Sequence, residues 1–165
     1  MEINQSWPKL LQQRLVENNY PYRVFNSSIA GDTTQGGLTR LPRLLDKHHP
    51  AIVIIELGGN DGLRGISLDV TRANLLTMIE LSRAAGAAVL LTEMKIPPNY
   101  GMSYTRKFNE IYGSLSKKYD LPLIPFLMDN IALDADLMQA DGIHPNARAQ
   151  AVLLDNIWPT LEPEL

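Results

Sequence analysis

A histidine and an aspartate near the carboxyl end of the chain have the types and the spacing for acid–base chemistry. Asp141 and His144 lie in the run Asp-Gly-Ile-His-Pro-Asn. A carboxylate this close in sequence can accept a hydrogen bond from the imidazole, which fixes the ring tautomer and stabilises its protonated form. A plainer interpretation remains open, because Asp-Gly is common in turns that have no catalytic role. The spacing alone leaves both interpretations open: a general base oriented by an acid, or an ordinary turn.

Two further loops offer hydrogen-bond donors for a developing negative charge. Asn60 follows the predicted strand of residues 51–57, and a side-chain amide at the end of a strand can donate to an oxyanion. Gly31 offers a backbone N–H in the run Ala-Gly-Asp-Thr-Thr. Each loop alone is also typical of an ordinary turn, and the glycines of residues 58–65 do not match the dinucleotide-binding pattern.

Short β-rich runs alternate with longer helical patterns, and these elements must position the three loops. The predicted strands are residues 23–26, 51–57, 88–92 and a short one within 121–126. The predicted helices include residues 7–15, 38–45, 75–85, 104–115 and 151–161, with Gly86 as the stop of the third and Pro145 at the first position of the last. This alternation predicts a parallel, doubly wound sheet, which binds ligands beyond the carboxyl ends of its strands.

Composition excludes several classes of function. A chain of 165 residues fits one domain, and a net charge of -3 gives no electrostatic case for nucleic-acid binding. The absence of cysteine excludes disulfides, thiolate chemistry and cysteine-bound metals. The apolar run of residues 51–55 is too short to cross a bilayer. The first eight residues have no basic segment followed by an apolar one, so we expect no signal peptide in this chain.

Taken together, the three loops resemble the conserved blocks of the SGNH (GDSL-type) hydrolases. Residues 30–34 resemble the block with the oxyanion glycine, residues 58–61 the block with the oxyanion asparagine, and residues 141–146 the block with the catalytic acid and base. The resemblance is closest to the bacterial arylesterases and multifunctional thioesterase–lysophospholipases. Matching segments follow in the same order from residue 7 to about residue 158.

The resemblance implies a three-layer α/β/α, flavodoxin-like fold with a parallel sheet, and a single hydrolase domain over residues 1–165. It implies that His144 is the general base and then the general acid, that Asp141 orients it, and that Gly31 and Asn60 hold the oxyanion. No metal or organic cofactor is implied. The expected substrate is a small acyl ester, acyl thioester or lysophospholipid. The expected substrate-binding residues are Gly59, Pro98, Tyr100 and Ile143, although residues 97–101 are equally typical of a rigid connector.

One departure from the family is as informative as the match. The family opens with a strand and a Gly-Asp-Ser-Leu turn whose serine is the nucleophile, and these 165 residues contain no such segment. We therefore expect an N-terminally truncated hydrolase that lacks its first, central strand and is inactive as it stands. Thr33 follows a Gly-Asp pair, but the resemblance places it in the oxyanion block.

Two expectations concern the intact protein. The resemblance implies a periplasmic or secreted enzyme. The alternative is a catalytically inactive protein that binds an acyl ligand or another molecule. An in-frame Gly-Asp-Ser in the DNA upstream of codon 1 would distinguish the two.

Overall fold

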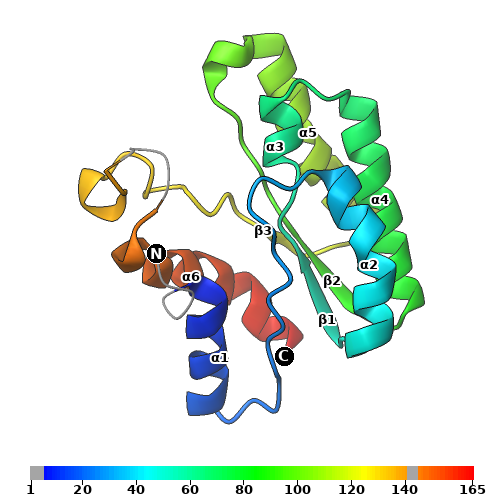
Figure 1. Cartoon of the computed structure of the whole chain (residues 1–165), viewed down its shortest axis with the longest axis vertical. Coiled ribbons are helices and arrows are strands. Elements are labelled where there is room, and N and C mark those ends of the chain that lie inside the picture. Colours follow the sequence, from blue (N-terminus) through cyan, green and yellow to red (C-terminus); the bar gives the residue numbers. More distant parts are fainter. Residues whose placement is uncertain (1–5, 141–144) are drawn as a thin grey trace. The chain divides into compact units, whose positions relative to one another are not determined.

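The computed structural model describes residues 6–140 and 145–165 (Figure 1). The chain divides into two compact units. The first unit comprises residues 27–126, and the second comprises residues up to 26 together with residues 127–165. Each unit has its own buried apolar contacts.

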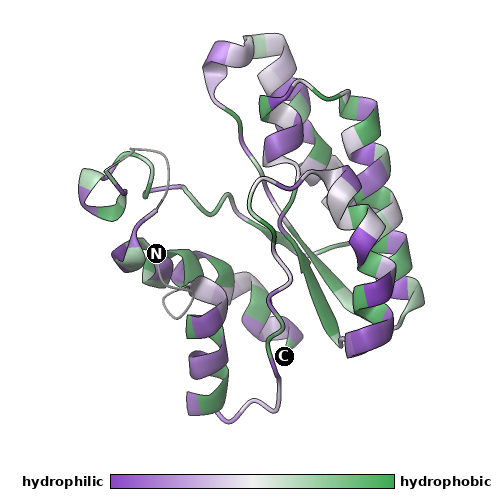
Figure 2. Ribbon diagram, viewed as in Figure 1, coloured by the Kyte–Doolittle hydropathy of each residue, from purple (hydrophilic) through white to green (hydrophobic). Residues whose placement is uncertain are grey.

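The first unit is built on a parallel sheet of β1 (Ile52–Ile55), β2 (Ala88–Thr92) and β3 (Leu123–Ile124), in the order β1-β2-β3. Ile52 pairs with Ala88, and Leu91 pairs with Leu123. The strands are almost uniformly hydrophobic, as expected for buried parallel strands (Figure 2). The sheet confirms three of the four predicted strands and their parallel direction.

Helices α2 (Thr34–His48), α4 (Leu68–Ala84) and α5 (Met102–Tyr119) lie side by side along this sheet (Figure 1). Their apolar faces meet in a core whose most deeply buried side chains include Leu75, Ile79, Phe108, Ile111 and Tyr112. Gly86 has a φ of 86° just beyond the end of α4, which agrees with its predicted role as a helix stop. The unit also contains two short helices, α3 (Gly59–Leu63) and η2 (Pro98–Tyr100).

The second unit is built on α1 (Trp7–Glu17) and α6 (Ala147–Leu161), with the short helices η3 (Ala135–Leu137) and η4 (Glu162–Glu164). The two long helices pack against each other (Figure 1). At their contact Arg14 donates to Asp155 at 2.6 Å, and its guanidinium lies 5.3 Å from the centre of the Trp158 ring. The predicted helices at residues 7–15 and 151–161 are therefore confirmed.

The prediction of a strand at residues 23–26 was wrong. A strand exists only where a neighbour supplies a ladder of hydrogen bonds. In the described part of the chain no strand pairs with this segment, and the Val24 N–H donates instead to the side-chain oxygen of Gln12 at 2.8 Å. Strand β1 likewise pairs only with β2 among the described residues.

Candidate active site

The loop that carries Gly31 is tied to the start of α2 by its own side chains. Gly31 has a φ of 76°, a left-handed conformation that favours glycine. The Asp32 carboxylate accepts from the Thr33 N–H at 3.0 Å and from Arg40 at 2.6 Å. Arg40 also donates to the carbonyl of Ser27 at 2.8 Å. The loop is therefore held at both ends against the first turns of α2.

Thr33 is the N-cap of α2. Its hydroxyl oxygen accepts from the Gly36 N–H at 3.3 Å and so satisfies one of the unpaired donors of the first turn. This contact gives Thr33 a structural role in starting the helix. It is consistent with the prediction that Thr33 does not replace the family's serine.

Asn60 lies in the first turn of α3, a helix within the segment that we predicted to be a loop. The helix begins after Gly58, which has a φ of 110°. A Cβ atom at Gly58 would lie 2.0 Å from the Tyr112 hydroxyl, which donates to the carbonyl of Leu57 at 2.9 Å. Only glycine tolerates both the positive φ and the close approach of the Tyr112 hydroxyl. The backbone therefore turns sharply here and places Asn60 directly beyond β1.

The structure brings the Gly31 loop and α3 together through two hydrogen bonds. The side-chain amide of Asn60 donates to the carbonyl of Asp32 at 3.0 Å. Arg64, at the end of α3, donates to the carbonyl of Gly31 at 3.0 Å. The two predicted oxyanion donors therefore belong to segments that contact each other. The role of Arg64 was missed, because a side chain that binds a distant backbone carbonyl leaves no pattern in the sequence.

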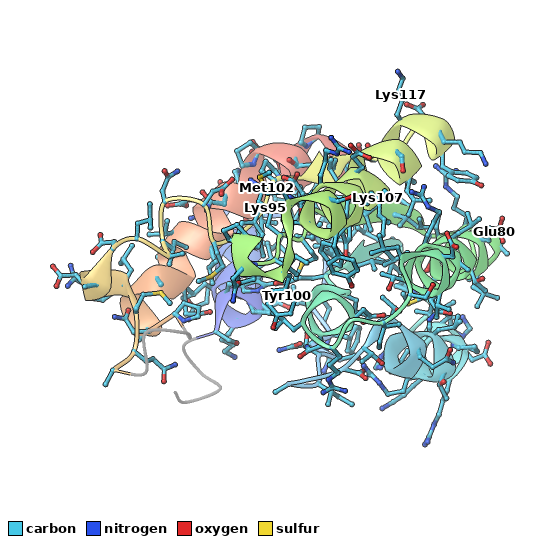
Figure 3. All side chains as sticks on the ribbon, turned by 90° about the horizontal axis from the view of Figure 1, so that it is seen from above. Glu80, Lys95, Tyr100, Met102, Lys107 and Lys117 are labelled. Atoms are coloured by element: carbon cyan, nitrogen blue, oxygen red, sulfur yellow. The ribbon has the colours of Figure 1, made fainter. Side chains whose placement is uncertain are left out.

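The expected substrate-binding residues of this unit lie in two places. Gly59 is half-buried in the first turn of α3, where a Cβ would lie 3.0 Å from the terminal carbon of Met94. Tyr100 and Met102 flank the junction of η2 and α5 and are 41% and 85% exposed (Figure 3). A shallow groove of about 480 Å³ adjoins this junction; its lining residues are Pro98, Met102, Thr105, Arg106, Asn109 and Glu110. Pro98 thus borders an open groove and Tyr100 lies beside it.

The predicted acid and base belong to the second unit. Asp141, Ile143 and His144 lie outside the described residues, so their roles stay predictions. On either side of this segment, Met138 and Pro145 form an antiparallel β-bridge, which we call the neck of the acid–base segment. Gln139 strengthens this neck by donating its side-chain amide to the carbonyl of Pro145 at 3.0 Å.

Asn146 fastens the same neck to α6. Its side-chain oxygen accepts from the N–H groups of Arg148 and Ala149 at 2.9 and 3.2 Å, which makes it the N-cap of the helix. Its side-chain nitrogen donates to the carbonyls of Asp136 and Met138 at 2.8 and 3.2 Å. Helix α6 therefore begins at Ala147, and the prediction that Pro145 occupies the first helical position was wrong. An asparagine caps a helix better because its side chain satisfies the free N–H groups.

Glu56 is a further candidate site residue, which the sequence analysis did not identify. It follows β1 directly, four residues before Asn60. Desolvation by the surrounding protein atoms raises the pKa of the carboxyl group to about 7, although the residue as a whole is exposed. The signal in the sequence was an acidic residue at the end of an otherwise apolar strand.

No group of three or more histidine, cysteine, aspartate or glutamate side chains is placed to hold a metal ion within residues 6–140 and 145–165. In the same residues, no helix combines the length and the apolar character needed to cross a membrane.

Comparisons with known proteins agree with the resemblance of the three loops. The GDSL-like lipase/acylhydrolase family matches residues 2–152. Esterase TesA of Pseudomonas aeruginosa is 48% identical over 165 residues, which are 100% of this chain and 82% of that protein. The thioesterase 1/protease 1/lysophospholipase L1 of Escherichia coli K12 is 43% identical over 163 residues, which are 99% of this chain and 77% of that protein.

Solved structures extend the match to three dimensions. The crystal structure of TesA has a TM-score of 0.95 to this chain at 48% identity and covers 100% of this chain and 92% of that one. The psychrotrophic esterase EstA from Pseudoalteromonas sp. has a TM-score of 0.94 at 37% identity, with 99% and 89% covered. These similarities confirm the predicted α/β/α fold class of the SGNH hydrolases. The chain belongs to the GDSL-like lipase/acylhydrolase family.

Proposed function

We propose that the protein is a serine ester hydrolase that cleaves acyl esters, acyl thioesters or lysophospholipids, and that residues 1–165 act as one hydrolase domain. The observation that carries this proposal is the hydrogen bond between the Asn60 amide and the Asp32 carbonyl, next to Gly31. It joins the two segments that would supply oxyanion donors, in a chain whose relatives are named as esterases and thioesterases.

The geometry of Asn60 suits an oxyanion donor. A carboxamide nitrogen has two N–H groups, and the Asp32 carbonyl engages one of them at 3.0 Å. That bond fixes the plane of the amide and leaves the second N–H for a substrate. The backbone N–H of Gly31 has no acceptor among the described residues, so this N–H is also available to a substrate. Donors oriented before the reaction stabilise the transition state without reorganisation.

The reaction proceeds through an acyl-enzyme. His144 removes the proton of a serine hydroxyl, and the serine oxygen attacks the carbonyl carbon, which places a negative charge on the carbonyl oxygen. Gly31, Asn60 and the serine N–H hold that charge. The intermediate collapses, and His144 gives its proton to the departing alcohol or thiol. Water then repeats the sequence and releases the acid. Asp141 orients His144 throughout.

The nucleophilic serine is the missing part of this machinery, because the 165 residues contain no Gly-Asp-Ser-Leu turn. The proposal assigns it to a segment of that type outside these residues. It also assigns contacts with the acyl group to Gly59, Pro98, Tyr100 and Ile143, and it places the enzyme in the periplasm or outside the cell. The relative EstA is inhibited by monoethylphosphonate, whose tetrahedral phosphorus resembles the intermediate of ester hydrolysis. That inhibition supports an acyl-enzyme route here.

The test compares this chain with the same chain preceded by a strand and a Gly-Asp-Ser-Leu turn taken from its own gene or from TesA. A p-nitrophenyl ester reports turnover. We expect no more than background from the shorter protein and robust turnover from the extended one. The matched control is the extended protein with alanine in place of the serine. Equal rates for that control and the extended parent would refute the serine mechanism.

A second candidate function is an inactive protein that binds an acyl ligand. The observation that favours it is the absence of a Gly-Asp-Ser-Leu turn from these residues. Binding of a fatty acid by the extended protein, without any hydrolysis of its esters, would support this alternative.

A further inference from the structure

Asp61 is a buried carboxylate beside the candidate oxyanion hole, and the mechanism above does not use it. The residue is 1% exposed and follows Asn60 in α3. A charged group in such a position costs much free energy unless hydrogen bonds replace its water. Asp61 therefore needs partners, and the identity of those partners indicates what it does.

The partners of Asp61 come from two other helices. Its carboxylate accepts from the N–H of Thr34 at 2.9 Å and also from the Thr34 hydroxyl. It accepts from the hydroxyl of Thr71 in α4 at 3.3 Å. Asn74, also in α4, donates to the Thr34 hydroxyl oxygen at 3.0 Å and closes the network. All four side chains are buried, so water does not compete for these bonds.

The bond to Thr34 places the charge where α2 favours it. Thr34 is the first residue of α2, and its N–H has no partner inside the helix. The amino end of a helix carries a partial positive charge that attracts a carboxylate. Asp61 thus satisfies a free donor and gains from the helix dipole. The bond is also a fixed link between α2 and α3.

This link spans the two segments of the candidate oxyanion hole. On one side Thr34 lies two residues after Asp32, whose carbonyl holds the Asn60 amide. On the other side Asp61 is the next residue after Asn60. A change at the link therefore alters the separation of Gly31 and Asn60. Arg64 supplies a second link to Gly31, but it lies at the surface, where water competes for its hydrogen bond.

We propose that Asp61 is a positioning residue that holds the Gly31 and Asn60 donors at the separation an oxyanion requires, through its bonds to Thr34 and Thr71. The inference rests on the proposed function, because it concerns the same site. Asp61 is buried, so its effect on the reaction is indirect. It acts through the backbone of α2 and through Asn60.

The test uses the full-length protein with its Gly-Asp-Ser-Leu segment and the variant Asp61→Asn. Asparagine keeps the shape, but its N–H group points at donors in the network. We expect kcat to fall about 10- to 100-fold with KM nearly unchanged, a smaller loss than for a deleted donor. The matched control is Leu115→Ala, which opens a cavity in the core of the same unit away from the network. It should lower the melting temperature and leave kcat unchanged.

A double variant separates positioning from a general loss of stability. Because part of the proposed effect of Asp61 passes through Asn60, the loss of kcat in the double variant Asp61→Asn, Asn60→Ala should be smaller than the product of the two single losses. Losses that multiply would overturn the inference. Parental kcat in Asp61→Asn would overturn it as well.

An extended parent protein that hydrolyses nothing would refute the proposed function. Spectroscopy would still test the positioning role of Asp61 in that case. The side-chain amide signals of Asn60 in a ¹⁵N–¹H spectrum should shift in Asp61→Asn, and the Thr34 N–H should exchange faster with solvent. The same signals should stay in place in Leu115→Ala. Unchanged Asn60 signals in folded Asp61→Asn would refute the positioning role.

Discussion

Asn60 is the residue at which a single side chain has the clearest expected effect on catalysis. In the full-length protein with its serine, Asn60→Ala should lower kcat by about 10²–10³, the usual cost of one lost oxyanion donor, with little change in KM. Steady-state hydrolysis of a p-nitrophenyl ester measures both constants. The control is Asn156→Ala, which removes an amide of the same size that donates to the carbonyl of Leu127. A kcat within twofold of the parent in Asn60→Ala would remove Asn60 from the oxyanion hole.

Substitutions of the predicted base and acid should lower kcat by more than Asn60→Ala does, and in a defined order. His144→Ala should abolish nearly all hydrolysis, because the base and the nucleophile act as a unit. Asp141→Asn should keep the fold and cost about 10⁴ in kcat, because the amide favours the wrong imidazole tautomer. The same ester assay, with circular dichroism to verify folding, measures these losses. Near-normal turnover in His144→Ala would show that the resemblance placed the base at the wrong residue.

Thr33 offers a prediction about stability. Thr33→Ala should lower the free energy of unfolding by about 1 kcal/mol, because the N-cap bond to Gly36 is lost. It should leave ester turnover unchanged, because the hydroxyl caps a helix and attacks no substrate. Urea unfolding and the ester assay measure the two effects. The matched control is Thr39→Ala, which removes an exposed hydroxyl within the same helix. Loss of turnover without loss of stability in Thr33→Ala would instead indicate a catalytic hydroxyl.

Residue types alone brought Gly31 and Asn60 into the candidate site. Gly31 and Asn60 were identified because glycine and asparagine after predicted strands match a known pattern. Asp61 and Arg64 were not, because their partners are a backbone N–H and a backbone carbonyl about 30 residues away in sequence. Such contacts depend on how α2 and α3 meet, which no local pattern records.

At the scale of elements, the long helices and buried strands could be predicted because their hydrophobic period is strong. The segment at residues 23–26 has the composition of a strand, but composition does not supply a neighbour to pair with. Helix α3 was missed because it has five residues, two of them glycine, and so has no helical period. Its start depends on the φ of Gly58 and on the nearby Tyr112 hydroxyl, both of which are tertiary features.

Asn146 makes an element-scale prediction, because it caps α6 and also fastens the neck of the acid–base segment. Asn146→Ala should lower stability by about 1 kcal/mol through the lost cap and should also lower turnover. Asn146→Ser is the informative partner, since serine also caps helices but cannot donate to Asp136 and Met138 together. We expect serine to restore the unfolding midpoint and not the turnover. Parental turnover in the alanine variant would show that the neck needs no such clamp.

At the scale of the whole molecule, the free edge of β1 is the feature that the family's first strand would cover. Strand β1 pairs only with β2 among the described residues, and Ile52, Val53 and Ile54 are each partly exposed, whereas four of the five residues of β2 are buried. Each unpaired backbone group that becomes buried costs about 1–3 kcal/mol, so a strand that pairs with this edge removes several such costs. The extended chain should therefore unfold at a clearly higher urea concentration than the 165-residue chain.

The control for this prediction keeps the length of the added segment and removes its ability to pair. Proline at alternate positions of the added strand eliminates the N–H donors that a ladder needs, so this version should unfold at the same urea concentration as the 165-residue chain. The 165-residue chain should also associate at high concentration, because an exposed apolar edge is a template for pairing between molecules. Analytical ultracentrifugation over a concentration series measures that association. A monomer at every concentration, with the same unfolding midpoint in all three proteins, would mean that the edge of β1 is satisfied without the added strand.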